Sequence, residues 1–217
     1  MAKIILKPDT EFKVGKIVCV GRNYDEHIAE MSAERTSDPI LFLKPSTAIL
    51  NEGNNITLPT FSNEVHHEIE LALLIGKEAK SIQSNDWTKY IAGAGIALDL
   101  TLRDHQSIAK KNGLPWCVSK GFDGACPIGS FFPLDTLSNL GELRIELFVN
   151  GELRQSGNTN QMIFPPGNLL EYITSIFTLE TGDIVLTGTP SGVGPLQSGD
   201  RLQGVIENIG EINFNIG

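Results

Sequence analysis

The sequence predicts a β-rich α+β fold rather than a doubly wound parallel sheet. Short apolar segments with the two-residue period of strands recur along the chain, and few helical patterns lie between them. Proline and glycine are spread along the chain instead of gathering in a linker, and no internal repeat is visible. A chain of 217 residues fits one domain. We therefore expect a single domain over residues 1–217, with residues 1–15 as a short N-terminal extension.

The elements of the first half follow from local patterns. They are a buried strand, a turn, a short helix and a second strand, at residues 17–20, 21–24, 25–33 and 40–44. Further strands are expected at residues 68–75 and 95–100. Thr101 to Asp104 resembles a capping box that opens a helix, and Gly113 is its expected stop after about Lys111.

The second half contains a strong hairpin signal. Residues 143–149 alternate between apolar and polar, and Asn150-Gly151 then separates them from residues 152–154. A helix and three strands complete the expected fold, at residues 168–177, 183–187, 201–207 and 211–216.

Composition excludes several classes of protein. Hydrophobic residues make up 41% and charged residues 20%, and no apolar stretch reaches the roughly 20 residues of a membrane span. The formal net charge of −9 argues against nucleic acid or an anionic membrane as a partner. Lys7 and Pro8 come too early for a signal peptide. We expect a cytoplasmic protein, or one of the mitochondrial matrix if the source is eukaryotic. The three cysteines lack metal-ligand spacing and are expected to be reduced core residues.

Glu68 and Glu70 stand two residues apart in an otherwise apolar strand pattern. Side chains alternate along a strand, so the two acids share one face while Ile69 and Leu71 point to the other. Two neighbouring carboxylates that are partly out of water repel each other unless they are paired, protonated or bound to a cation. The alternative is that both acids face solvent on an edge strand and pair with lysines.

Asp99 supplies a third acid at the end of a second apolar strand. Oxygen ligands from Glu68, Glu70 and Asp99 suit a hard divalent ion, Mg2+ or Mn2+. The remaining positions of an octahedral ion would be left to water and substrate, which is what a catalytic metal needs.

His27 and Glu30 lie three residues apart on the first expected helix and share a face. The carboxylate could orient the imidazole as a general base that activates water. A surface histidine and glutamate pair on a solvated helix would give the same pattern.

Basic residues occur in two further settings. Arg103, Gln106 and Lys110 recur on one face of the helix after Asp99, where they would suit a carboxylate ligand or form an exposed cationic stripe. Lys44 and Lys120 each end or follow an apolar stretch, so each is either snorkelling or buried for a function.

The glycine-rich segment 188–194 lacks the lysine of a Walker motif and precedes no evident helix, which argues against nucleotide binding. Its glycines would let backbone N–H groups approach a substrate carboxylate. An ordinary tight loop is the alternative.

Taken in order, these segments resemble the fumarylacetoacetate hydrolase family, most closely its acylpyruvase and oxaloacetate decarboxylase branch. The similarity spans about residue 16 to the C-terminus. It rests on the order and spacing of these motifs: Gly21-Arg22-Asn23-Tyr24 with His27 and Glu30, Leu43-Lys44-Pro45-Ser46, His67-Glu68-Ile69-Glu70, Leu98-Asp99 with Thr101, Arg103-Asp104 and Gln106, Gly113-Leu114-Pro115-Trp116, Ser119-Lys120-Gly121-Phe122, and residues 186–194.

The resemblance implies the mixed β-sandwich roll of that family's C-terminal domain and a homodimer. It implies Glu68, Glu70 and Asp99 as ligands of Mg2+ (or Mn2+). The implied catalytic residues are His27, Glu30 and Lys120. The implied contacts of a small anionic 2-oxo acid substrate are Arg22, Lys44, Arg103, Gln106 and Thr189.

The implied reaction is the Mg2+-dependent hydrolysis of a C–C bond in acylpyruvates, such as acetylpyruvate or fumarylpyruvate, to pyruvate and a carboxylic acid. The alternatives are oxaloacetate decarboxylation, oxo-acid tautomerisation or isomerisation, and a metal-stabilised binding protein on the same scaffold. Val20 stands where the branch that cleaves fumarylacetoacetate itself has a further acidic ligand. This departure favours the smaller acylpyruvase-like group.

Overall fold

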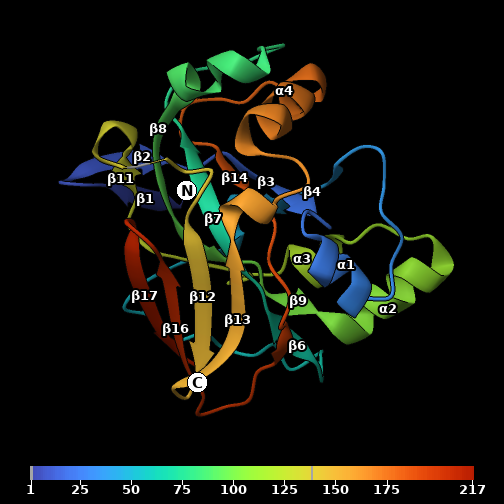
Figure 1. The fold of residues 1–217 in the computed structure, drawn as a ribbon. Helices are drawn as coiled ribbons and strands as arrows, with labels where there is room; N and C mark the ends of the chain where they lie inside the picture. The colour runs from blue at the N-terminus through green and yellow to red at the C-terminus, as the bar shows by residue number, and fades with distance from the viewer. Residues whose placement is uncertain (1, 138) are drawn as a thin grey trace.

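A mixed eight-stranded sheet forms the centre of the structure, a computed structural model that describes residues 2–137 and 139–217 (Figure 1). Its strand order is β4-β3-β14-β7-β8-β10-β5, with β11 paired to β8. The strands are β3 (Lys16–Gly21), β4 (Ile40–Pro45), β5 (Ile49–Asn51), β7 (Ile69–Ile75), β8 (Ile91–Leu98), β10 (Cys126–Ile128), β11 (Phe132–Pro133) and β14 (Ile184–Leu186). The pairs β14–β3 and β10–β5 are parallel, and the other pairs are antiparallel.

A four-stranded antiparallel sheet packs against one face of the central sheet. It consists of β12 (Arg144–Val149), β13 (Glu152–Asn158), β16 (Arg201–Ile206) and β17 (Gly210–Asn215). Leu147 and Leu202 from this sheet share one core with Ile69 and Leu71 of β7. The two sheets therefore form the strand-rich α+β sandwich that the sequence predicted.

The other face of the central sheet is covered by the N-terminal residues. β1 (Lys3–Leu6) and β2 (Thr10–Lys13) form an antiparallel hairpin. Ile4 lies in a second core with Ala72 and Leu74, the β7 residues that point away from the first core. The expected extension is thus packed onto the body of the protein.

Three short helices gather beside a small three-stranded sheet, on the right of the view in Figure 1, and α4 (Pro166–Ile176) lies away from them at the top. The helices are α1 (Asp25–Glu30), α2 (Arg103–Asn112) and α3 (Cys117–Lys120), and the sheet has the order β15 (Gly194–Pro195), β6 (Val65–His67) and β9 (Thr101–Leu102). The 3-10 helices are η1 (Ser46–Ala48), η2 (Ser84–Tyr90), η3 (Leu134–Thr136) and η4 (Thr159–Gln161). Within the described residues, no helix has the length and apolar character to cross a membrane.

Two local expectations of secondary structure are wrong, and Cys117 is exposed, whereas the sequence predicted a core residue. Helix α1 ends at Glu30 rather than near Ala33, and Ser32 adopts a φ of 48°, which interrupts a helix. The capping box does not form, because Thr101 pairs with His66 between β9 and β6 and Leu102 is the N-cap of α2. Asp104 instead accepts hydrogen bonds from the Ser62 hydroxyl and the Asn63 N–H group.

Two turn expectations are confirmed. Asn150 and Gly151 have φ values of 54° and 82°, as the hairpin between β12 and β13 requires. Helix α2 ends at Gly113, whose φ of 64° is the left-handed conformation that favours glycine at this position.

Candidate active site

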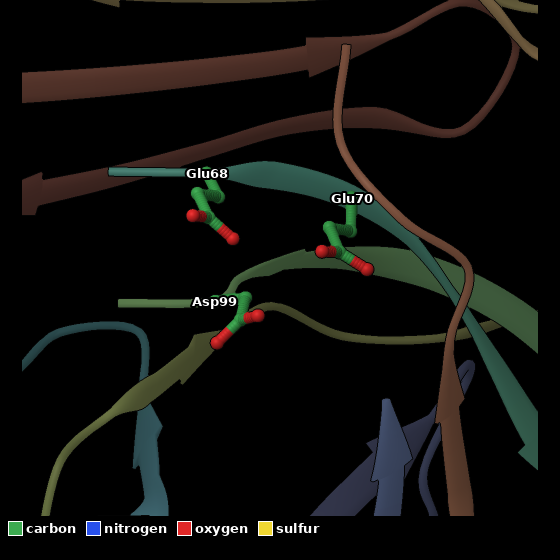
Figure 2. Close-up of side chains that lie close together, drawn as sticks. All are labelled: Glu68, Glu70 and Asp99. Carbon is green, nitrogen blue, oxygen red and sulfur yellow. The ribbon is translucent and has the colours of Figure 1, made fainter. Parts of the chain in front are cut away.

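Three buried acids meet where β7 and β8 lie side by side. Glu68 immediately precedes β7, Glu70 lies within it, and Asp99 immediately follows β8. The antiparallel pairing sets Ile69 opposite Leu98, so the three carboxylates project into one space. One oxygen of each lies within 4.8 Å of the others, and Figure 2 shows the three side chains close together, where the chain segments that carry them run beside one another. The acids are 4%, 1% and 1% exposed, so the alternative of a solvent-facing pair is wrong.

Two of the acids are paired with buried cations. Glu68 accepts hydrogen bonds from Arg103 Nη2 (2.5 Å) and Lys120 Nζ (2.8 Å), and Asp99 Oδ2 accepts one from Lys120 Nζ (2.5 Å). Burial raises the pKa of Glu68, but the charges of Lys120 and Arg103 outweigh it and hold that pKa well below its usual range. Burial opposes the charge of Lys120, yet Asp99 and Glu68 raise its pKa, so this ammonium stays protonated.

Glu70 differs from its neighbours because it forms no ion pair with any described residue. Its Oε2 accepts one hydrogen bond, from the Gly188 N–H group at 2.6 Å. Burial, followed by the charges of Asp99 and Glu68, raises the pKa of Glu70 well above its usual value. Its negative charge is therefore unfavourable in the absence of a cation.

Asp99 Oδ1 adds a second sign of an ion site. It is buried and accepts no hydrogen bond from a described residue, although Lys44 Nζ lies 2.8 Å away. A buried carboxylate oxygen that accepts no hydrogen bond from the described residues, beside a glutamate that has no ion pair with them, fits a hard divalent cation, and the all-oxygen donor set suits Mg2+ or Mn2+. Glu68, Glu70 and Asp99 would hold it. Val20 lines the same cavity with an apolar side chain, consistent with a set of three acids.

The cavity above the acids collects most of the predicted site residues. Besides the three acids, it is lined by Arg22, His27, Arg103, Gln106, Lys120 and Thr189. Lys110, Phe42 and Trp116 also contribute to its wall. Of the predicted set, Glu30 and Lys44 do not line it.

Glu30 acts on the cavity through His27. His27 Nδ1 lies 3.0 Å from Glu30 Oε2, and the other oxygen, Oε1, accepts a hydrogen bond from the Gly192 N–H group at 3.0 Å. The His27 side chain is 9% exposed, so it is not a surface group. Since Nδ1 faces Glu30, Nε2 is the ring nitrogen that remains for a water or substrate in the cavity.

Arg103 and Gln106 are buried rather than part of an exposed stripe. Arg103 Nη1 donates to Gln106 Oε1 at 2.8 Å, and Arg103 Nε donates to His66 Nδ1 at 3.3 Å. The Gln106 carbonyl is therefore occupied, which leaves its amide N–H groups as the donors for an anion in the cavity. Arg22 also lines this cavity and donates to the Glu34 carbonyl at 3.3 Å.

Lys44 corrects one expectation. Its side chain is fully buried behind the acids, and its ammonium donates to the carbonyls of Lys120, Ala125 (3.0 Å) and Leu100 (3.4 Å). With three donors on three carbonyls and Asp99 beside it, Lys44 has no proton left for a substrate. The geometry does not fit the expected substrate contact; Lys44 holds Asp99 and the chain around it.

Replacing Lys44 by methionine should lower the free energy of unfolding by about 3–5 kcal/mol, because it leaves three buried carbonyls without donors and removes one of the two cations beside buried Asp99. Urea denaturation of the metal-free protein measures this. Lys110→Met, which removes a lysine of the same cavity wall that forms no ion pair with a described residue, is the control and should change stability by less than about 0.5 kcal/mol. A Lys44→Met protein as stable as wild type would contradict this role.

The glycine-rich segment serves the protein's own acids. Gly188 and Gly192 have φ values of 98° and 96°, which require glycine, and their N–H groups donate to Glu70 and Glu30. The expectation that these two N–H groups face a substrate carboxylate is therefore wrong. One loop instead positions both a candidate metal ligand and the partner of His27.

Two buried polar residues were not predicted. Asn23 donates to the Thr187 and Phe164 carbonyls, which fixes the turn before α1. Gln155 connects β13 to His67 and Thr189. A single asparagine or glutamine in an ordinary local pattern carries no signal of its partners, so the sequence could not reveal either role.

Comparisons with known proteins identify the family of the chain. Residues 16–216 match the family described as Fumarylacetoacetate (FAA) hydrolase C-terminal. The chain is 44% identical to the bovine protein named oxaloacetate tautomerase FAHD1, mitochondrial, over 92% of this chain and 90% of that protein. It is 49% identical to oxaloacetate decarboxylase, mitochondrial, of Dictyostelium discoideum, over 87% of each chain.

A solved structure extends the comparison to the fold. Fumarylpyruvate hydrolase from Pseudomonas aeruginosa, in complex with Mn2+ and pyruvate, superposes with a TM-score of 0.95 at 33% identity, covering 99% of this chain and 95% of that one. These similar proteins are named as enzymes. The family match covers most of the chain, and the chain therefore belongs to the fumarylacetoacetate hydrolase family.

Proposed function

We propose that this protein is a divalent-metal-dependent enzyme that hydrolyses acylpyruvates to pyruvate and a carboxylic acid. One observation carries the proposal: the buried set Glu68, Glu70 and Asp99 lines the same cavity as His27, which Glu30 orients. Hydrolysis needs a site that activates the substrate carbonyl and, on the opposite side of the substrate, a base that activates water. This cavity offers residues for both tasks.

The charges of the site favour an anionic substrate. Three buried carboxylates are balanced by three buried cations, Lys44, Arg103 and Lys120. A bound dication would therefore give the site a net charge of about +2, which suits an anion. Arg22, Gln106 and Thr189 line the cavity as further groups that can bind the carboxylate of a 2-oxo acid.

Each catalytic residue then has a defined task. A divalent cation supplies, when bound, a Lewis acid that polarises a carbonyl oxygen. His27 Nε2 takes a proton from water, whose oxygen forms a bond with the distal carbonyl carbon of the acylpyruvate. Lys120 stabilises the developing oxyanion. The C–C bond then breaks, its electron pair stays with the pyruvate fragment as an enolate, and a proton returned to that carbon gives pyruvate.

Oxaloacetate is a second candidate substrate, supported by the names of the bovine and Dictyostelium relatives. Tautomerisation or decarboxylation passes through an enol or enolate of the same 2-oxo acid group. Decarboxylation needs no attacking water, so His27 would have a smaller part in it than in hydrolysis. Tautomerisation needs no attacking water either, but it moves a proton between C3 and the enol oxygen, and His27 is a candidate for that transfer.

Product analysis distinguishes the candidates. The purified protein is incubated with Mn2+ or Mg2+ and, separately, with acetylpyruvate, fumarylpyruvate and oxaloacetate, and products are identified by NMR. Pyruvate plus an equal amount of acetate or fumarate supports hydrolysis. Enol–keto exchange of oxaloacetate without net consumption supports a tautomerase, and pyruvate with CO2 supports a decarboxylase. Absence of all these products would reject the proposal.

Anion binding should weaken as pH rises through about 8. Burial, then the charges of Arg103 and Arg22, lowers the pKa of Lys110 to about 8. The charged form attracts an anion, so affinity is highest below this pKa and is lost as the lysine deprotonates above it. We expect oxalate to bind the Mn2+-loaded protein about 3- to 10-fold more weakly at pH 9 than at pH 7, measured by calorimetry. Lys110→Met should bind weakly at both pH values; an unchanged pH profile in this variant would contradict the assignment.

The homodimer and the cytoplasmic location implied above belong to the same proposal. Light scattering of the purified protein tests the first, and imaging of the tagged protein in its host tests the second.

A further inference from the structure

Gln155 is a fully buried glutamine on a strand that is otherwise mostly exposed. The pairing of β12 with β13 explains its position: Leu147 lies opposite Gln155 and Phe148 opposite Leu153, so Arg154 has no partner. This β-bulge reverses the alternation. Leu153 is left 51% exposed, while Gln155 turns inward toward β6 and β7.

Every hydrogen-bonding position of the Gln155 amide is occupied. Oε1 accepts from the Ile69 N–H group at 3.1 Å and from His67 Nδ1 at 3.0 Å. Nε2 donates to the Pro190 carbonyl at 2.9 Å and to Thr189 Oγ1 at 2.8 Å. Backbone N–H groups only donate and backbone carbonyls only accept, so Ile69 and Pro190 fix which end of the amide is oxygen.

This orientation determines the role of the Thr189 hydroxyl. Its oxygen accepts a hydrogen bond from Gln155, so its own proton points to a different acceptor. No described residue accepts that proton, and Thr189, at 3% exposed, lines the cavity above the acids. The hydroxyl is thus arranged as a donor toward a ligand in the cavity.

The same bulge supports the loop that carries Thr189. Gly192 has a φ of 96°, and a Cβ atom there would lie 2.0 Å from the Arg154 carbonyl oxygen. The loop therefore packs directly on the bulged backbone. Gln155 joins this loop to the backbone at Ile69, between Glu68 and Glu70, so one side chain sets the distance between the anion donor and the acids.

We propose that Gln155 is a positioning residue that makes Thr189 a hydrogen-bond donor to the substrate anion without touching the substrate itself. The proposal rests on the proposed function, because it requires an anionic ligand beside the three acids. It assigns a purpose to the β-bulge, which no sequence motif marks.

A double-mutant cycle tests the proposal, with Thr189→Val removing the hydroxyl and Gln155→Met removing the amide. Calorimetry measures Mn2+ affinity alone and then oxalate affinity of the Mn2+-loaded protein. Each single variant should bind oxalate about 5- to 30-fold more weakly, and the double variant no more weakly than the worse single one. Mn2+ affinity should stay within about 3-fold of wild type, and Thr189→Ser should restore oxalate binding.

Controls separate this role from a loss of stability. Thr174→Val removes another buried hydroxyl, one that accepts from Ile82 and donates to Glu171, and should leave oxalate affinity unchanged. If thermal unfolding shows that Gln155→Met does not fold, the isosteric Gln155→Glu takes its place, since a carboxylate cannot donate to Thr189. Gln155→Glu should then weaken oxalate binding by a smaller factor in the Thr189→Val background than in the wild-type protein.

The outcomes also separate this inference from the proposed function. If wild type binds no oxalate with Mn2+ present, both fail. If wild type and Thr189→Ser bind oxalate and Thr189→Val does not, but Gln155 variants bind as wild type, only the role of Gln155 is overturned. Additive losses in the double variant would likewise show that Gln155 acts independently of Thr189 and overturn the proposal.

Discussion

Replacing Glu70 by glutamine should weaken Mn2+ binding by at least about 100-fold while leaving the metal-free protein as stable as wild type or more stable. Glu70 forms no ion pair with a described residue, so the substitution leaves no cation unpaired. The glutamine carbonyl can still accept the Gly188 hydrogen bond. Calorimetric titration with Mn2+ and urea denaturation without metal measure the two effects.

The pH dependence gives an independent check on Glu70. Its raised pKa means that the folded protein retains a proton which the unfolded chain releases near its ordinary pKa of 4.5. The stability of the metal-free protein therefore falls, through this group, as pH rises above about 4.5 toward the folded pKa. Glu70→Gln should lose this component, so its free energy of unfolding should exceed that of the wild-type protein by an amount that grows with pH.

The control is Glu64→Gln, which changes an exposed acid that pairs with His66 outside the site. This variant should bind Mn2+ with wild-type affinity. A Glu70→Gln protein with wild-type Mn2+ affinity would show that Glu70 is not a ligand.

Replacing His27 by asparagine should reduce acylpyruvate hydrolysis by about 10²- to 10⁴-fold, the range expected when a general base is lost. Decarboxylation of oxaloacetate, which needs no attacking water, should fall by less than about 10-fold. Steady-state kinetics with both substrates at saturating Mn2+ measures the difference.

Glu30→Gln is the matched variant for this prediction. It retains a group that can accept a hydrogen bond from His27 but removes the charge, so hydrolysis should fall by a smaller factor than in His27→Asn. Mn2+ affinity should be unchanged in both variants, since neither residue belongs to the acid cluster. Equal losses of acylpyruvate hydrolysis and oxaloacetate decarboxylation would contradict the assignment of His27 as the base for water.

The acid cluster could be predicted because its signal is local. Glu68 and Glu70 interrupt an apolar strand with a two-residue period, and such acids have no ordinary structural purpose in a core. His27 and Glu30 were visible as a pair because three residues span nearly one helical turn. In each case the pattern that forms the element also sets the side chains on one face.

The roles of the two buried lysines could not be separated in the same way. Lys44 and Lys120 both follow apolar segments, and the three carbonyls around Lys44 come from residues 100, 120 and 125, which are distant in sequence. Gln155 was missed because a β-bulge reverses the face that alternation predicts after the hairpin. The capping box failed because Thr101 pairs with another strand, a tertiary contact that outweighs a weak local motif.

A crystal structure with Mn2+ and oxalate, in which an anomalous difference map locates the manganese, tests the central claim most directly. We predict one manganese peak in the cavity, about 2.1 Å from one oxygen of each of Glu68, Glu70 and Asp99, with oxalate completing its coordination. A manganese ion held by other residues, or none at a concentration where calorimetry shows binding, would contradict the account.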